Sequence, residues 1–420
     1  MYQKTILDNG LRIVTSAMPH TRSVSVAFFM GVGSRYEKDP EAGLSHFIEH
    51  LVFKGTQRRP TSKEVCEQVE GVGGVLNGST DRELTVYWSK VPHVHFPLAL
   101  DVLVDMLRNS KFAPEDVVKE RQVIIEELSM VHDSPHQRVD ILIDEVVWPD
   151  QPLGRDVAGS KETVSSFQRE AALRFLAKQY TPGNTVVSVA GNIGHDDVVD
   201  AMAKALGDWP SGKPRPYFPA QDGQQAPRVK VVRRLTEQAY LCLAVRGLSL
   251  SHPDRHALNL LNVIMGDGMS SRLFMEIREK RGLAYDVYSY VNNFLDSGAF
   301  IVFAGVDPKR VGDAIQAILE ELARIRDHVP EEDVQKAKDL TKGRMLLRME
   351  DTHSVAGWLG SQEALLGRIL TVDEAVRRID AVTVADVQRV ARQLLVQDKL
   401  NLAVVGPYKS DKKFYPILKF

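Results

Sequence analysis

Two histidines and a glutamate stand close together near the start of the chain, within the segment 43–56, GLSHFIEHLVFKGT. His46 and His50 are four residues apart, so a helix would place both imidazoles on one face, where they could bind one cation. Glu49 could then approach a water molecule bound to that cation. This H-x-x-E-H order, the reverse of H-E-x-x-H, predicts a zinc site that activates water. The alternative is that both histidines lie on a polar, solvated helix face.

A catalytic zinc site needs a third protein ligand and an open fourth position. The segment 115–130, EDVVKERQVIIEELSM, reads as an acid-rich helix. Glu120 and Glu127 are seven residues apart, or two turns along one face, whereas Glu126 points about 100° away. We therefore expect Glu127 to be the third ligand of one zinc ion and Glu120 to orient a histidine. Without the upstream motif, such a helix would indicate only a solvated surface.

The composition is that of an ordinary globular protein. The chain has 420 residues, enough for two or three domains, and its formal net charge of −2 argues against a nucleic-acid partner bound by bulk charge. No apolar run approaches the roughly 18 residues that cross a membrane, and the N-terminus does not resemble a signal peptide. With only Cys66 and Cys242, a disulfide framework is excluded. We expect a cytoplasmic protein without a membrane partner.

The chain reads as a duplication around a linker. Residues 208–228 are rich in proline, glycine and glutamine, and they separate residues 1–207 from residues 229–420. Helix and strand patterns recur in the same order in both halves, at 25–33 and 240–247, at 114–117 and 331–334, and at 164–192 and 382–407. This order predicts two duplicated α+β domains, each with a mostly antiparallel sheet packed with helices. The second half has no H-x-x-E-H, so we expect one zinc ion per chain, bound in the first half.

The motifs together resemble the pitrilysin/insulinase peptidases, or inverzincins, and most of all their short-chain branch, which includes the mitochondrial processing peptidase and its bacterial relatives. The matching segments are 31–37, 46–56, 73–88 and 120–127. The resemblance implies two domains related by pseudo-two-fold symmetry. It implies a zinc-dependent endopeptidase, with Glu49 as general base, that cleaves extended oligopeptides or presequence-like peptides inside a clamshell chamber. It also implies a bacterial source and a homodimer, or a heterodimer with a related chain.

The second half contributes one further match, in residues 269–289, MSSRLFMEIREKRGLAYDVYS. The resemblance implies that Arg278 and Tyr285 reach the zinc site from the second domain. Tyr285 would then stabilise the oxyanion of the tetrahedral intermediate, and Arg278 would anchor a substrate carbonyl. The alternative is a helix that stops at Gly282, with Tyr285 packed in the next strand.

Residues 76–80, LNGST, fit an exposed edge strand. The resemblance implies that extended peptides bind there by strand addition, with Asn77, Gly78 and Ser79 as substrate-binding residues. Gly78 stands where the family often has alanine, which permits close approach of a backbone. The alternative is that Asn77 caps a glycine-rich turn over residues 71–78.

Two other functions remain open. The chain could be a catalytically silent or partner-dependent subunit of a heterodimeric processing peptidase, although members of that class typically lose H-x-x-E-H. It could also be an unrelated protein stabilised by structural zinc. Such a site is normally closed by four protein ligands, and the sequence offers no fourth candidate.

Overall fold

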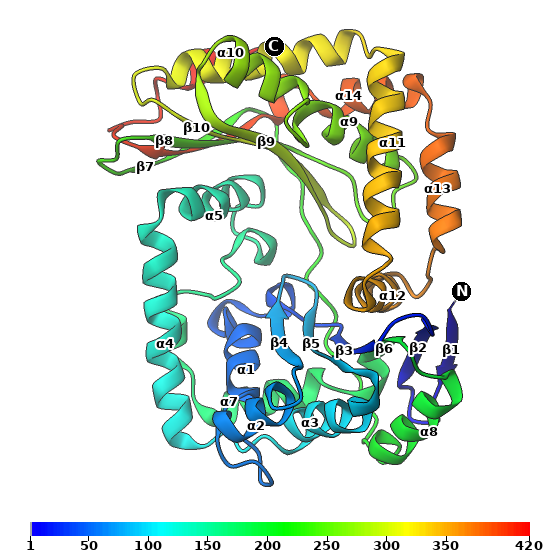
Figure 1. The fold of residues 1–420 in the computed structure, drawn as a ribbon. Coiled ribbons are helices and arrows are strands. Elements are labelled where there is room, and N and C mark those ends of the chain that lie inside the picture. The colour runs from blue at the N-terminus through cyan, green and yellow to red at the C-terminus, as the bar shows by residue number, and fades with distance from the viewer. Residues whose placement is uncertain (1) are drawn as a thin grey trace. The chain divides into compact units, whose positions relative to one another are not determined.

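The computed structural model describes residues 2–420, which form two compact units (Figure 1). The first unit contains the chain up to Leu128, together with Asp156–Phe218 and Leu346–Thr371. The second unit contains Ser129–Arg155, Pro219–Met345 and Val372–Phe420. None of the helices in the described residues is both long enough and apolar enough to cross a membrane.

The first unit is built on a six-stranded sheet with the order β1-β2-β6-β3-β5-β4. Only β2 and β6 run parallel, and every other neighbouring pair is antiparallel. The edge strand β4 alternates between exposed and half-buried residues, as expected for a strand with one face against other elements. The strands are β1 Gln3–Ile6, β2 Arg12–Ala17, β3 Ser23–Met30, β4 Val75–Thr80, β5 Thr85–Pro92 and β6 Thr185–Gly191.

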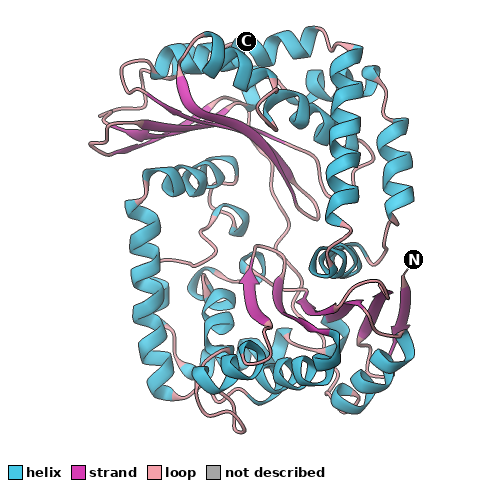
Figure 2. Cartoon of the chain, viewed as in Figure 1, coloured by secondary structure: helices cyan, strands magenta, loops and turns pink. Residues whose placement is uncertain are grey.

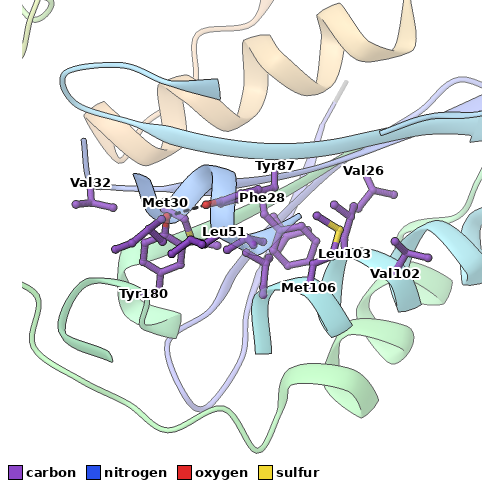
Figure 3. Close-up of a cluster of buried hydrophobic side chains, with 14 of the residues drawn as sticks. Val26, Phe28, Met30, Val32, Leu51, Tyr87, Val102, Leu103, Met106 and Tyr180 are labelled. Carbon is purple, nitrogen blue, oxygen red and sulfur yellow. Dashed lines mark hydrogen bonds between the residues drawn. The ribbon is translucent and has the colours of Figure 1, made fainter. Parts of the chain in front are cut away.

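Helices of the first unit bury one face of this sheet in its largest core. Figure 3 shows Leu51 of α1 and Met106 of α3 among side chains of the sheet, such as Phe28. These three side chains are fully buried, so helix and sheet position each other by close packing. The helices of this unit are α1 Leu44–Val52, α2 Ser62–Glu70, α3 Phe96–Asn109, most of α4 Pro114–Asp133, α6 Lys161–Ser166, α7 Arg169–Gln179, α8 His195–Leu206 and α12 Thr352–Leu366.

The helix α12 comes from the second half of the sequence, yet it packs on β2, β3 and β6 of the first unit. Its Gly360 lies so close to β3 that a Cβ atom there would be 2.1 Å from Cε2 of Phe29. Its buried Glu363 accepts hydrogen bonds from Lys4 and Arg12. The strands β3 and β6 are therefore covered on both faces, which explains their nearly continuous burial.

The second unit repeats this design with five strands in the order β7-β11-β8-β10-β9. Figure 2 shows that each unit combines strands with helices. The pair β7–β11 is parallel and the rest are antiparallel, which matches β2-β6-β3-β5-β4 strand for strand. The strands are β7 Arg228–Arg233, β8 Ala239–Arg246, β9 Ala284–Asn293, β10 Gly298–Val306 and β11 Asn401–Gly406. The helices are α5 Pro135–Val147, α9 Arg255–Gly266, a π-helix at Phe274–Lys280, α10 Val311–Asp327, most of α11 Glu331–Arg348, α13 Val372–Ala381 and α14 Val384–Leu394.

The predicted fold class, two repeated α+β domains with mostly antiparallel sheets, is confirmed. The compact units, however, do not follow the expected division into residues 1–207 and 229–420, because α5 and α12 each belong to the unit of the other half. The residue that follows α5 shows the reason: Trp148 is fully buried and donates a hydrogen bond to Ser297 of the second unit. The pseudo-two-fold relation between the halves stays a prediction.

Short 3₁₀ turns complete the chain. Two of them, Ser34–Tyr36 and Asp39–Glu41, lead into α1. The others are His93–His95, Pro152–Gly154, Pro182–Asn184, Gln397–Lys399 and Tyr415–Ile417.

Candidate metal and catalytic site

The helix α1 begins at a glycine with positive φ, and the carboxylate that caps it comes from six residues earlier in the chain. Gly43 has a φ of +95°, and a Cβ atom there would lie 2.4 Å from the carbonyl oxygen of Ala158. The fully buried carboxylate of Glu37 accepts hydrogen bonds from the backbone N–H of Gly43, at 2.8 Å, and of Ser45, at 2.6 Å. Backbone N–H groups that a helix start leaves without partners are thus satisfied by a negative charge, which the helix dipole favours.

The rest of α1 separates apolar from polar residues. Phe47, Ile48 and Leu51 are fully buried in the core. His46 and His50, by contrast, are half-buried on the opposite face, with their ring centroids 4.6 Å apart. The predicted spacing therefore places both imidazoles side by side, as expected for an i, i+4 pair on a helix.

The helix α4 brings Glu127 to both histidines. Its Oε1 lies 3.8 Å from Nε2 of His46, and its Oε2 lies 3.6 Å from Nε2 of His50. These distances are too long for hydrogen bonds but suit three ligands that share one ion at about 2 Å from each. The ligand atoms of the three side chains lie within 4.8 Å of one another. Among the residues that the structure describes, this is the one cluster of three histidine, cysteine or carboxylate side chains whose ligand atoms lie this close together.

The predicted neighbour Glu120 contacts His50 on its other nitrogen. Oε2 of Glu120 lies 3.1 Å from Nδ1 of His50, and its Oε1 lies 2.7 Å from Nζ of Lys54. Burial acts to raise the pKa of the Glu120 carboxyl, but the hydrogen bonds from His50 and Lys54 outweigh it and hold the pKa below its usual value. A charged Glu120 accepts a hydrogen bond from Nδ1–H of His50, which leaves the Nε2 lone pair of His50 directed at Glu127.

His46 is held in its neutral form. Burial, followed by the nearby His50, lowers the pKa of His46 to about 4. Because the neutral imidazole is the form that binds a metal ion, His46 is ready to act as a ligand at neutral pH.

Glu49 stands next to His50 on α1 and is not one of the three grouped ligands. Its Oε2 accepts a 2.6 Å hydrogen bond from Oγ1 of Thr80, at the end of β4. Burial raises the pKa of the Glu49 carboxyl above its usual value, against the opposing effects of Thr80 and His50. A carboxylate with a raised pKa suits proton transfer near neutral pH.

The predicted edge strand is present as β4, so the strand assignment of residues 76–80 is confirmed and Asn77 lies outside the preceding turn. Asn77 and Ser79 are exposed, and Oδ1 of Asn77 accepts the N–H of Gly78 at 2.8 Å. Gly78 faces the site: a Cβ atom there would lie 3.2 Å from Cγ and Oε1 of Glu49. Substrate binding by these three residues stays a prediction.

Arg278 and Tyr285 lie together in the second unit. The Arg278 guanidinium carbon lies 4.8 Å from the ring centroid of Phe274 and 4.8 Å from that of Tyr285. Tyr285, near the start of β9, is 74% exposed, so it is not packed in the strand as the alternative interpretation required. Their role at the metal group stays a prediction.

Sequence reasoning missed three residues that surround the site. Lys54 stands four residues after His50, a helical spacing that could have indicated it. Thr80 stands two residues after Gly78, so strand alternation places both on one face. Glu37 ends the matching segment 31–37, but no spacing rule indicated its capping role, because it bonds backbone groups across a turn.

Two family models match the chain. The model described as insulinase, peptidase family M16, matches residues 12–161, which include both histidines, Glu49, Glu120 and Glu127. The model described as the peptidase M16 inactive domain matches residues 166–341. That second range contains no H-x-x-E-H, in agreement with a metal group in the first half alone.

Relatives match over nearly the whole chain. A protein named uncharacterized zinc protease from Streptomyces coelicolor is 38% identical over 415 residues, covering 97% of this chain and 90% of the relative. The uncharacterized zinc protease YmxG of Bacillus subtilis is 36% identical, covering 97% of this chain and 98% of its own. The crystal structure of a protease from Helicobacter pylori has the same fold, with a TM-score of 0.92 at 23% identity over 97% of this chain and 99% of that one.

Proposed function

This chain belongs to the insulinase family of M16 peptidases, in its short-chain branch, and from that premise we propose that it is a zinc-dependent endopeptidase that cleaves extended peptides. The observation that carries the proposal is the convergence of His46, His50 and Glu127. Relatives named zinc proteases, which match over nearly the full length, support the coarser conclusion that this is a metallopeptidase fold with a peptidase-family role.

The donor set fits one zinc ion. Two imidazole nitrogens and one carboxylate oxygen are typical of a catalytic zinc site, whereas a structural site is closed by four protein ligands. When bound there, zinc would supply Lewis-acid polarisation of the scissile carbonyl and acidification of a water molecule. Glu120 keeps His50 in the tautomer that such a site requires.

Glu49 acts as the general base in this proposal. Thr80 occupies its Oε2, which leaves Oε1 to take a proton from the attacking water. The same carboxyl then donates that proton to the leaving amine, so the group returns to its starting state.

Extended peptides would bind along β4. This strand pairs with β5 on one side only, so its other side offers backbone N–H and C=O groups for strand addition. Asn77, Gly78 and Ser79 would contact the added strand. Tyr285 would stabilise the oxyanion and Arg278 a substrate carbonyl, in a chamber closed by both domains. Presequence-like substrates, a cytoplasmic location and a homodimer or heterodimer with a related chain belong to the same proposal.

The alternative of a catalytically silent subunit is less well supported. The chain keeps both histidines, Glu49, Glu127 and the supporting Glu120, and these groups lie in a workable geometry. A partner-dependent subunit with an active site of its own remains compatible with this arrangement.

Metal analysis combined with peptide cleavage tests the proposal. The purified chain should hold about one zinc per chain, and it should cleave a quenched fluorescent oligopeptide. A chelator should abolish cleavage and added zinc should restore it, and the assay should be repeated with related chains added as partners. Metal-free protein, or cleavage that persists after chelation, would reject a zinc peptidase.

A further inference from the structure

Glu49 is held from two sides by the same strand, β4. Oγ1 of Thr80 donates a 2.6 Å hydrogen bond to Oε2 of Glu49. Two residues earlier, the α-carbon of Gly78 lies so near that a Cβ atom would approach Cγ and Oε1 of Glu49 to 3.2 Å and Cε2 of Phe53 to 2.9 Å. The carboxylate thus accepts a hydrogen bond at Oε2, and the backbone of Gly78 lies close to Oε1.

These contacts follow from strand alternation. Residues 78 and 80 are both half-buried and point to the α1 side of β4, whereas Asn77 and Ser79 between them are exposed. A freely rotating carboxylate on a helix surface would populate several rotamers. Here one hydrogen bond and one close contact favour a single orientation.

We propose that Thr80 is a positioning residue for Glu49, so that the strand that receives the peptide also sets the direction of the general base. The inference rests on the proposed function, because it assigns Thr80 a part in peptide cleavage. The same strand would then bind the peptide through its unpaired edge and orient the carboxylate of Glu49 through the side chain of Thr80. A shift of β4 would move the scissile bond and Glu49 together.

The hydroxyl is the group that matters. Valine has almost the same shape as threonine but cannot donate a hydrogen bond, so Thr80→Val would free the Glu49 carboxylate while keeping the packing. Serine keeps the hydroxyl and loses only a methyl group, so Thr80→Ser should restore the contact. Thr80 is not one of the three metal ligands, so the zinc content should not change in either variant.

Thr5 provides a matched control. It lies on β1, the opposite edge strand of the same sheet, is half-buried, and makes a 2.8 Å side-chain hydrogen bond to Nε2 of His195. Thr5→Val therefore removes a comparable edge-strand hydrogen bond at a place that does not touch Glu49. It should leave peptide cleavage unchanged.

The experiment compares wild type, Thr80→Val, Thr80→Ser and Thr5→Val in zinc content, thermal unfolding and steady-state cleavage of one quenched peptide. We expect Thr80→Val to bind one zinc, to unfold within a few degrees of Thr5→Val, and to lose about 10- to 100-fold in kcat with KM changed less than about threefold, as for a lost hydrogen bond to a charged group. Thr80→Ser should recover most of kcat.

A second variant covers the other side of the carboxylate. Gly78→Ala should lower kcat by about two- to tenfold with zinc retained, because the new methyl group must displace Glu49 or Phe53. If Thr80→Val failed to fold, Thr80→Ala, which also lacks the hydroxyl, would take its place beside Thr80→Ser: a kcat in Thr80→Ala equal to that of Thr80→Ser would overturn the role of Thr80.

The outcomes separate the two claims. Zinc-dependent cleavage by wild type together with an unchanged kcat in Thr80→Val would overturn the role of Thr80 and leave the peptidase intact. A raised KM with unchanged kcat would also overturn it, since Thr80 would then serve substrate binding alone. A wild-type protein without zinc-dependent cleavage would overturn the proposed function itself and this inference with it.

Discussion

Nδ1 of His50 lies 3.1 Å from Oε2 of the buried Glu120, on the side of the ring away from Glu127. Lys54 binds the other oxygen of the same carboxylate at 2.7 Å. The ring orientation of His50 is therefore set by Glu120 of α4, which is itself paired with Lys54, two residues beyond the end of α1. The metal group depends on residues that would not themselves touch the ion.

Glu120→Gln should weaken zinc binding by about 10- to 100-fold, the usual cost of losing a carboxylate behind a ligating histidine. The dissociation constant can be measured by competition with a chromophoric chelator. Glu126→Gln is the matched control, because Glu126 is exposed on the same helix and bonds only Gln122 among the contacts that the structure shows for it. Equal zinc affinity in Glu120→Gln and wild type would show that Glu120 does not support His50.

Glu37→Ala should lower the free energy of unfolding by about 2–4 kcal/mol, because it leaves two backbone N–H groups at the start of α1 without their charged acceptor. Chemical denaturation measures the change. Glu170→Ala removes an exposed acid from the first turn of α7 and should cost less than about 0.5 kcal/mol. Similar losses in both variants would refute the capping role of Glu37.

Two glycines on α12 should respond to alanine with opposite signs. Gly360→Ala should destabilise the fold by about 1–3 kcal/mol, because its methyl group would overlap the ring of Phe29. Gly357→Ala meets no atom within 4 Å and should stabilise the same helix by up to about 1 kcal/mol. Thermal unfolding of the two variants tests how tightly α12 packs on the first sheet. Stabilisation by both substitutions would contradict that packing.

Asp386 should make stability depend on acid pH. The hydroxyl and backbone N–H of Thr383, then Arg389, hold the pKa of Asp386 at about 2, below the 3.8 of a free carboxyl. Since the folded pKa is the lower one, the stabilisation is complete above about pH 4 and is lost as the pH falls toward 2. The difference in Tm between wild type and Asp386→Asn should therefore be constant from pH 7 to 5 and should shrink below pH 4. A difference that persists unchanged to pH 2 would exclude this carboxylate as its source.

Much of the site could be predicted because its residues follow helical spacing. His46 and His50 are one turn apart, and Glu120 and Glu127 are two turns apart, so each pair shares a face whatever the rest of the chain does. The edge strand at 76–80 and the repeated order of strands were also predictable, since both depend on local patterns.

The remainder depends on contacts between distant segments. Glu37 finds backbone groups across a turn, and Thr80 meets Glu49 only because β4 packs beside α1. The sequence also could not predict that α5 belongs to the second unit and α12 to the first. In a duplicated sequence these two helices occupy equivalent positions, so either could pack on either sheet. Helix patterning shows that a face is apolar but not which sheet will cover it.

The most direct measurement of the central claim is zinc content and peptide cleavage by Glu49→Gln. Glutamine has nearly the same shape as glutamate and still accepts the hydrogen bond from Thr80, but it cannot take a proton from water. We predict one zinc per chain, as in wild type, and a kcat lower by about 10²- to 10⁴-fold. A Glu49→Gln protein that binds zinc and cleaves peptides at the wild-type rate would contradict the account.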